Sequence, residues 1–379
     1  MFLAAVSLTL HSCAKAPETS GFEASKSLPG YTQPTFSQYA AQTKEWIQNN
    51  RVFLTKNRAK ELQTNTPFEQ RPQGITNPKK GILLVHGLGD SPGYFKDIAG
   101  VLAKQGFLVR TILLPGHGSK PADASLARYE DWSGAVAHHA ALLEQKVDTL
   151  WLGGFSTGAN LVTSYALDHD NVEGLLLFSP AFYPKAQTLL RFAPVISYLW
   201  DWVDVDQEKN IMRYDSLSTH LAKLYYYSMK EVQQKLEDAT FQKPVLMTFS
   251  ADDSVLKPQK TKEVFTKRFL HPGSVFVCYG SCVQNSDPRI QSFPGRIPAS
   301  NISNFSHLSV LFSPQHWYYG KNGEFIMYNN GQEDKNPPTL RSNLWFSAWG
   351  YKQEGKYHAR LTYNPYFKQL RTILAEVLR

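Results

Sequence analysis

From residue 81 onward, hydrophobic residues in this chain gather into short, continuous runs separated by polar segments. The first run, 81–87, reads GILLVHG and holds no polar side chain before His86. A continuous aliphatic run of this length is typical of a strand buried on both faces of a parallel sheet. We expect strands at 81–87, 107–116, 148–154, 172–180, 244–250 and 274–280.

Helical patterns lie between these runs. Ser91 and Pro92 are suited to the start of a helix, and Gly106 is suited to its end. The expected helices are 91–105, 129–145, 156–168, 257–269 and 365–378. Strands that alternate with helices predict an α/β fold whose mostly parallel sheet is covered by helices on both faces.

Two segments lack this alternation. Residues 13–80 are polar and hold one expected helix within 38–62, so we interpret them as a tether followed by a pre-strand segment. Residues 181–243 carry many aromatic side chains but little strand pattern. Because this second segment lies between two core strands, we expect a helical insertion above the sheet within a domain that spans 81–379.

The first ten residues, MFLAAVSLTL, form an uncharged apolar run that is too short to span a bilayer. The run resembles the core of a signal peptide, which we expect at residues 1–12. Leu10-His11-Ser12-Cys13 resembles the lipobox of bacterial lipoproteins, which implies lipidation of Cys13. The alternative is an ordinary cleaved signal followed by a chance cysteine.

Composition narrows the class of protein. Hydrophobic residues make up 42% of the 379 residues, which excludes a disordered chain, and three cysteines are too few for a disulfide-stapled miniprotein. Cys278 and Cys282 are close enough in sequence for a local disulfide in an oxidising compartment, and free thiols are the alternative. The net charge of +8 leaves an acidic partner open.

The sequence Gly154-Phe155-Ser156-Thr157-Gly158 matches the G-x-S-x-G nucleophile elbow, with an expected strand before it and a helix after it. Glycines permit the sharp strand-to-helix turn, and the helix N-terminus favours developing negative charge at the serine. Ser156 is therefore the candidate nucleophile. A plain turn rich in glycine and serine is the alternative interpretation.

The loop after the first expected strand supplies the second motif. His86-Gly87-Leu88-Gly89 is suited to donate a backbone N–H to an oxyanion hole, so Leu88 and Thr157 are the two expected donors. We interpret His86, and also His117 in LPGHG, as residues that order their loops by hydrogen bonding.

The segments VHGLGDSP, LLPGHG and GFSTG together resemble the α/β-hydrolase superfamily, especially its monoacylglycerol lipase and lysophospholipase-like serine hydrolases. Hydrolases of this fold often carry Gly-x-x-Asp-x-Val after a later strand. The resemblance then implies Asp253 as the acid, with Asp252 as the alternative, although Ser250 replaces the glycine.

The base should come last in the chain, since the superfamily orders its triad as nucleophile, acid and base. His307 follows the last expected strand and is preferred to His316, whose aromatic neighbours suggest packing. The interval of 54 residues between Asp253 and His307 suggests an insertion from Cys278 to about Pro298.

The resemblance implies hydrolysis of carboxylic esters of acyl lipids, with residues 181–243 as a lid. An acyltransferase or a peptidase on the same triad is the enzymatic alternative, and a non-catalytic anchored binding protein is the other. No basic helix or aromatic platform suggests nucleic-acid binding, and no metal or organic cofactor is implied.

The positive charge is concentrated near the proposed anchor. Residues 14–80 hold ten lysines and arginines against five glutamates, a net +5 of the total +8. Basic residues next to a lipid anchor favour an anionic bilayer, and a merely solvated tether is the alternative. We therefore expect a lipoprotein of the bacterial cell envelope whose partners are a lipid substrate and a membrane surface.

Overall fold

The computed structural model describes residues 21–282, 287–332 and 336–379 and divides the chain into two compact units. Within the described residues, the N-terminal unit holds 21–176 and 187–239, and the C-terminal unit holds 177–186 and the chain from 240 onward. The expected signal peptide at 1–12 and the expected lipidation at Cys13 lie outside the described residues. No helix in the described ranges has the length and apolar character that crossing a bilayer requires.

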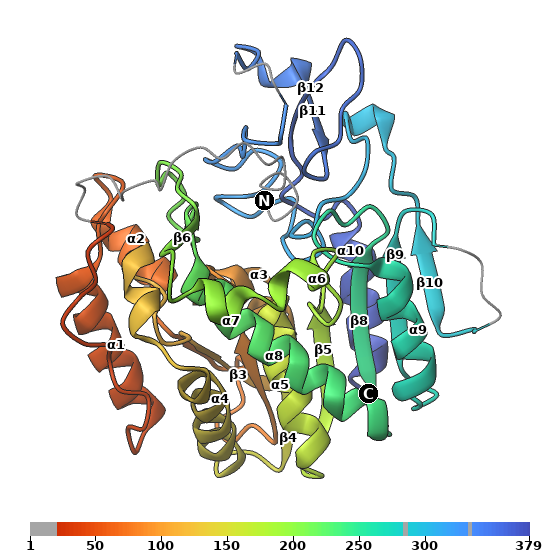
Figure 1. Ribbon diagram of the computed structural model, residues 1–379. Helices are drawn as coiled ribbons and strands as arrows, with labels where there is room; N and C mark the ends of the chain where they lie inside the picture. Colours follow the sequence, from red (N-terminus) through yellow and green to blue (C-terminus); the bar gives the residue numbers. More distant parts are fainter. Residues whose placement is uncertain (1–20, 283–286, 333–335) are drawn as a thin grey trace. The chain divides into compact units, whose positions relative to one another are not determined.

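A sheet in the order β1-β3-β2-β4-β5 forms the centre of the N-terminal unit. Figure 1 labels β3, β4 and β5 of this sheet. Its strands are β1 (Glu69–Gln70), β2 (Lys80–Val85), β3 (Phe107–Ile112), β4 (Thr149–Phe155) and β5 (Val172–Phe178), whose last two residues are assigned to the C-terminal unit. Strand β2 pairs in parallel with β3 and β4, whereas the short β1 is antiparallel to β3.

The sheet is covered on both faces. Every side chain from Ile82 to Val85 is 0% exposed, although successive side chains of a strand point to opposite faces. The covering helices include α3 (Lys96–Lys104), α4 (Tyr129–Glu144) and α5 (Thr157–Asp168). The strands and helices expected between residues 81 and 168 are thus confirmed, although β3 ends at Ile112 and not at residue 116. The segment after Ser91 starts as a 3-10 helix, Pro92–Phe95, and the Ser91 side chain makes no capping hydrogen bond.

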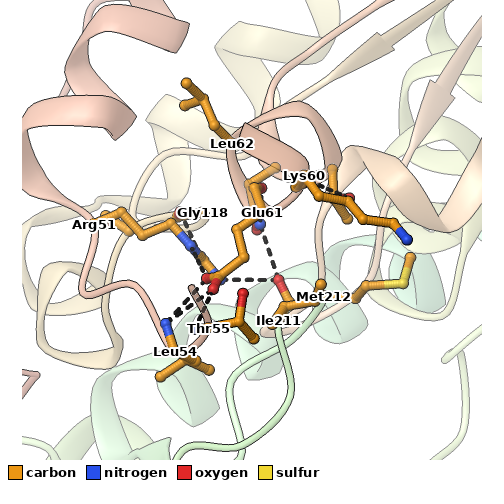
Figure 2. Close-up of polar contacts among 12 residues, drawn as sticks. Arg51, Leu54, Thr55, Lys60, Glu61, Leu62, Gly118, Ile211 and Met212 are labelled. Atoms are coloured by element: carbon orange, nitrogen blue, oxygen red, sulfur yellow. Dashed lines mark hydrogen bonds and ion pairs between the residues drawn. The ribbon is translucent and has the colours of Figure 1, made fainter. Parts of the chain in front are cut away.

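Residues 36–80 contribute two helices and the short strand β1 to the N-terminal unit, and the division of 13–80 into a tether and a pre-strand segment stays a prediction. Two helices, α1 (Phe36–Asn50) and α2 (Arg58–Asn65), replace the single helix expected within 38–62. Figure 2 shows the ion pair that joins Arg51, at the end of α1, to Glu61 on α2. Arg51 Nε lies 3.0 Å from Glu61 Oε2, and the two side chains are 4% and 0% exposed.

This buried ion pair also joins distant parts of the chain. The Arg51 guanidinium donates to the carbonyl oxygens of Gly118 at 2.8 Å and Ile211 at 2.9 Å. Glu61 accepts backbone N–H groups of Leu54 and Thr55 in the segment between the two helices. Because these bonds engage the backbone N–H groups of Leu54 and Thr55, those groups are not available for a continuous helix, and residues 51–57 form a non-helical connection.

The insertion expected at 181–243 is only partly helical. Within the N-terminal unit it forms α6 (Gln187–Leu190), α7 (Ala193–Ile196), β6 (Trp202–Asp204), β7 (Leu217–Ser218) and α8 (Thr219–Asp238). Strands β6 and β7 make an antiparallel ribbon, and α8 packs on α5. Residues 181–186 belong to the C-terminal unit instead, where Pro184 bridges to Leu256. A lid function for this insertion stays a prediction.

The C-terminal unit is built on three parallel strands in the order β8-β9-β10. Its elements are β8 (Val245–Ser250), α9 (Pro258–Arg268), β9 (Val275–Tyr279), β10 (Ile290–Phe293), β11 (Leu344–Ser347), β12 (Tyr357–Arg360) and α10 (Phe367–Val377). Cys278 and Cys282 are joined by a disulfide with a Cα–Cα distance of 6.3 Å. The insertion suggested after Cys278 therefore contributes a strand, β10, to the sheet.

We predict that Glu61→Ala lowers the free energy of unfolding by about 3–5 kcal/mol, because it leaves a buried guanidinium without its carboxylate. The matched control is Asp148→Ala, which breaks the pair with Lys79 between side chains that are 63% and 73% exposed. We expect that change to cost less than about 1 kcal/mol. Denaturant unfolding measures both variants, and equal effects would mean that the buried pair of Arg51 and Glu61 stabilises the fold no more than an exposed pair does.

Candidate active site

Ser156 occupies a strained turn between β4 and α5. Its backbone has φ 53° and ψ −114°, a conformation that residues with a side chain rarely adopt. Thr157, the next residue, is the first residue of α5, so the serine stands at the positive end of the helix dipole. The G-x-S-x-G motif therefore has the sharp strand-to-helix geometry that the elbow interpretation requires.

The two glycines of this motif have no room for a side chain. A Cβ added at Gly158 would lie 2.0 Å from the Val85 carbonyl oxygen and 2.5 Å from that of His86. One added at Gly154 would lie 2.4 Å from the backbone of Gly158. Since backbone atoms cannot move aside cheaply, glycine at 158 permits the close approach of α5 to the end of β2, and glycine at 154 permits the tight turn from β4 into α5.

The loop after β2 passes directly beside the nucleophile. A Cβ added at Gly87 would lie 3.1 Å from Cβ of Ser156 and 2.6 Å from Asp90 Oδ2. Gly89 has φ 75°, which favours glycine, and its N–H donates to Nε2 of His117 at 3.0 Å. Because this hydrogen bond fixes the direction of the Gly89 N–H, it also fixes the orientation of the Leu88–Gly89 peptide to which that N–H belongs.

His86 and His117 are confirmed as residues that order this loop. Leu114 N–H donates to His86 Nε2 at 3.0 Å, and both imidazoles are completely buried. Burial lowers the pKa of His117 to about 4 and that of His86 well below its usual value. Both rings are therefore neutral at pH 7, as a ring nitrogen that accepts an N–H must be.

The two expected oxyanion donors are available. No described residue accepts the backbone N–H of Leu88, whereas the neighbouring Gly89 N–H is engaged. Thr157 is the first residue of α5, and the first N–H groups of a helix have no partner within the helix. Two N–H groups beside a serine at a helix N-terminus can stabilise the oxyanion of a tetrahedral intermediate.

The C-terminal unit pairs the expected acid with the expected base. His307 Nδ1 lies 2.7 Å from Asp253 Oδ2, and Asp253 is 0% exposed. The other carboxylate oxygen, Oδ1, accepts the N–H groups of Val255 at 2.8 Å and Leu256 at 3.0 Å. The carboxylate is therefore fixed in the turn after β8, and it can hold the imidazole in a single tautomer.

The pKa of Asp253 lies below its usual value. Burial raises this pKa, but the charge of His307 and three hydrogen bonds, from His307, Val255 and Leu256, lower it more strongly. Asp253 is consequently ionised at neutral pH. A carboxyl whose pKa is lowered in the folded state stabilises the fold above its unfolded pKa, and this stabilisation is lost as the pH falls through the folded pKa.

The alternative acid and base do not meet in this way. Asp252 makes no hydrogen bond to His307, its side chain is exposed, and partial desolvation raises its pKa. His316 is 3% exposed, and its Nδ1 accepts the N–H groups of Tyr318 and Tyr319. Burial lowers the pKa of His316 to about 4, so it serves as a neutral packing residue.

Sequence reasoning missed two hydroxyl groups that hold the base loop. Ser250 Oγ donates to the Phe305 carbonyl at 2.8 Å, and Ser179 Oγ donates to the His307 carbonyl at 2.8 Å. The glycine that Ser250 replaces could not make such a bond. The departure from the Gly-x-x-Asp pattern was the available signal, because a serine there introduces a donor at the end of a buried strand.

The three expected catalytic residues are divided between the units. Ser156 belongs to the N-terminal unit, whereas Asp253 and His307 belong to the C-terminal unit. The hydrogen bond from Ser156 to His307 therefore stays a prediction. Within the described ranges no group of three His, Cys, Asp or Glu side chains is arranged to hold a metal ion.

Comparison with known proteins places the chain in a family. The model of the S33 serine aminopeptidase family of hydrolases matches residues 76–269, about half of the chain. The chain belongs to this family. With the mostly parallel strands and their covering helices, this membership confirms the α/β-hydrolase fold expected from the sequence.

Relatives of this hydrolase include a thermostable monoacylglycerol lipase from Bacillus sp. (strain H-257), 30% identical over 105 residues that cover 28% of the chain. The match spans 42% of that lipase, less than half of its length. A structure from work on the metagenome-derived lipolytic enzymes LipS and LipT is 20% identical to this chain, with a TM-score of 0.47. The match covers 56% of this chain and 86% of the chain in that structure. The crystal structure of Paleococcus ferrophilus monoacylglycerol lipase is 18% identical to this chain, with a TM-score of 0.46. The match covers 60% of this chain and 87% of that lipase.

We predict that Asp253→Asn lowers kcat by about 10⁴-fold, because an asparagine favours the wrong tautomer of the His307 imidazole. Asp252→Asn is the matched control, since it changes the neighbouring carboxylate, which has no bond to the base. Steady-state kinetics on a soluble ester compares the two variants. A larger loss from Asp252→Asn would reverse the assignment of the acid.

Proposed function

We propose that this protein is a serine hydrolase that cleaves carboxylic esters of acyl lipids through Ser156, His307 and Asp253. The observation that carries the proposal is the strained Ser156 at the N-terminus of α5, with the Leu88 and Thr157 N–H groups free to receive an oxyanion. A serine in a simple turn would need neither the strain nor two free donors.

The reaction runs through an acyl-enzyme. Ser156 Oγ attacks the ester carbonyl carbon while His307 takes its proton, and Asp253 stabilises the imidazolium that forms. The N–H groups of Leu88 and Thr157 stabilise the oxyanion, and His307 returns the proton to the departing alcohol. Water, activated by the same imidazole, then attacks the acyl carbon and releases the carboxylic acid and free Ser156.

A lipid substrate is supported by the surface of the insertion as well as by the lipase relative. Leu189, Phe192, Val195, Tyr198, Leu199 and Trp200 are all exposed, Tyr198 by 84%. Arg191 and Lys223 lie over the rings of Phe192 and Tyr198. Apolar and aromatic side chains beside cations are suited to a lipid surface. We therefore also propose a membrane surface of the bacterial envelope as the partner.

We predict that Ser156→Ala abolishes hydrolysis of p-nitrophenyl esters, a loss of about 10⁴-fold or more in kcat. The wild type should prefer medium- and long-chain acyl esters, monoacylglycerols or lysophospholipids to short-chain esters. Steady-state assays over such a panel measure both. The panel includes aminoacyl p-nitroanilides, because the family is named for serine aminopeptidases. It also includes an acceptor alcohol, which tests for acyl transfer. Faster cleavage of the anilides, or acyl transfer that exceeds hydrolysis, would favour the alternative enzymes.

A further inference from the structure

A half-open groove with a volume of about 420 Å³ lies at the β1 edge of the N-terminal unit. Residues 34–40 at the start of α1, residues 67–71 around β1, Arg110 on β3 and residues 142–146 at the end of α4 line it. The volume lies in the usual range of small-molecule sites. The first two of these segments precede the family match at 76–269, so the N-terminal extension of this chain builds half of the groove.

The groove carries a surplus of positive charge. Arg71, Arg110 and Lys146 line it together with a single carboxylate, Glu69. Glu69 is shared, since Oε1 lies 2.9 Å from Arg71 Nε and Oε2 lies 2.9 Å from Arg110 Nε. Lys146 has no ion pair with any described residue. Because three cations share one carboxylate, the lining has a net positive charge that an anionic ligand can neutralise.

Arg110 offers a donor that the fold does not use. Its side chain is 6% exposed, and its Nε and Nη1 donate to Glu69 and to the Leu142 carbonyl. No described residue accepts a hydrogen bond from Nη2. The guanidinium is also held over the Phe36 ring, with Cζ 4.9 Å from the ring centroid. A preorganised donor of this kind loses little entropy when it binds a carboxylate.

The groove also has an apolar wall, formed by the rings of Phe36 and Phe68 and by Ala40 and Leu142. Thr35, Ser37 and Gln145 add uncharged polar groups to the lining. A ligand that fits both parts needs an anionic head and a hydrocarbon tail, because the walls would exclude a small inorganic anion from most of the volume.

We propose that this groove is a second ligand site, which binds the anion of a fatty acid. The carboxylate lies between Arg110 and Lys146, and the acyl chain lies along Phe68 and Leu142. A fatty acid is also what the proposed hydrolysis would release, but the groove is formed without Ser156. Binding there is consequently independent of the proposed catalytic function.

The test uses a diazirine analogue of dodecanoate with the full-length protein, followed by proteolysis and mass spectrometry of the cross-linked peptides. We expect labelling within residues 34–40 or 142–146, in the wild type and equally in Ser156→Ala, and competition by dodecanoate but not by 1-dodecanol. Lys146→Glu should weaken dodecanoate binding by about fivefold or more. Ser37→Trp, which adds bulk at the exposed rim of the groove, should remove the labelling.

Lys104→Glu is the matched control, since it reverses the charge of another exposed lysine outside the groove. Labelling confined to other peptides would overturn the proposal. So would groove labelling that Ser37→Trp leaves unchanged, or equal effects of Lys146→Glu and Lys104→Glu. Ester hydrolysis measured on the same samples reports separately on the proposed function, because neither groove variant touches Ser156.

Discussion

The close approach of α5 to the end of β2 is the constraint on which the candidate site depends. Gly158 lies so near the Val85 and His86 carbonyl groups that a single Cβ would collide with both. This contact sets Ser156 beside the loop that carries Leu88, and the buried His117 fixes that loop through Gly89. The strain at Ser156 is therefore sustained by packing on several sides, as a strained functional residue requires.

The second stabilising element lies outside the family match. The buried pair of Arg51 and Glu61 ties the N-terminal helices to the loop at Gly118 and to the insertion at Ile211 (Figure 2). A buried ion pair offsets its desolvation cost only when all of its hydrogen bonds are made, and here the carbonyl and N–H partners complete it. The N-terminal extension thus supports the elements around the elbow and also contributes the groove near Arg110.

The sequence predicted most of the central fold because its aliphatic runs and glycine turns are local signals. The elbow at Ser156 and the acid after β8 follow from short motifs with a fixed context. The pairing of Arg51 with Glu61 could not be predicted from the sequence. A polar segment with scattered charges has the same sequence pattern whether its charges are solvated or buried. The roles of Ser250 and Ser179 likewise depend on contacts with the distant loop of His307.

The central claim is that Ser156 is an activated nucleophile, and mapping a covalent adduct tests it most directly. The wild type is treated with a fluorophosphonate and digested, and the modified peptide is identified by mass spectrometry. We predict one adduct per chain, on Ser156, whose formation is slowed by His307→Ala and not by His316→Ala. An adduct on a different residue, or labelling that persists in Ser156→Ala, would contradict it.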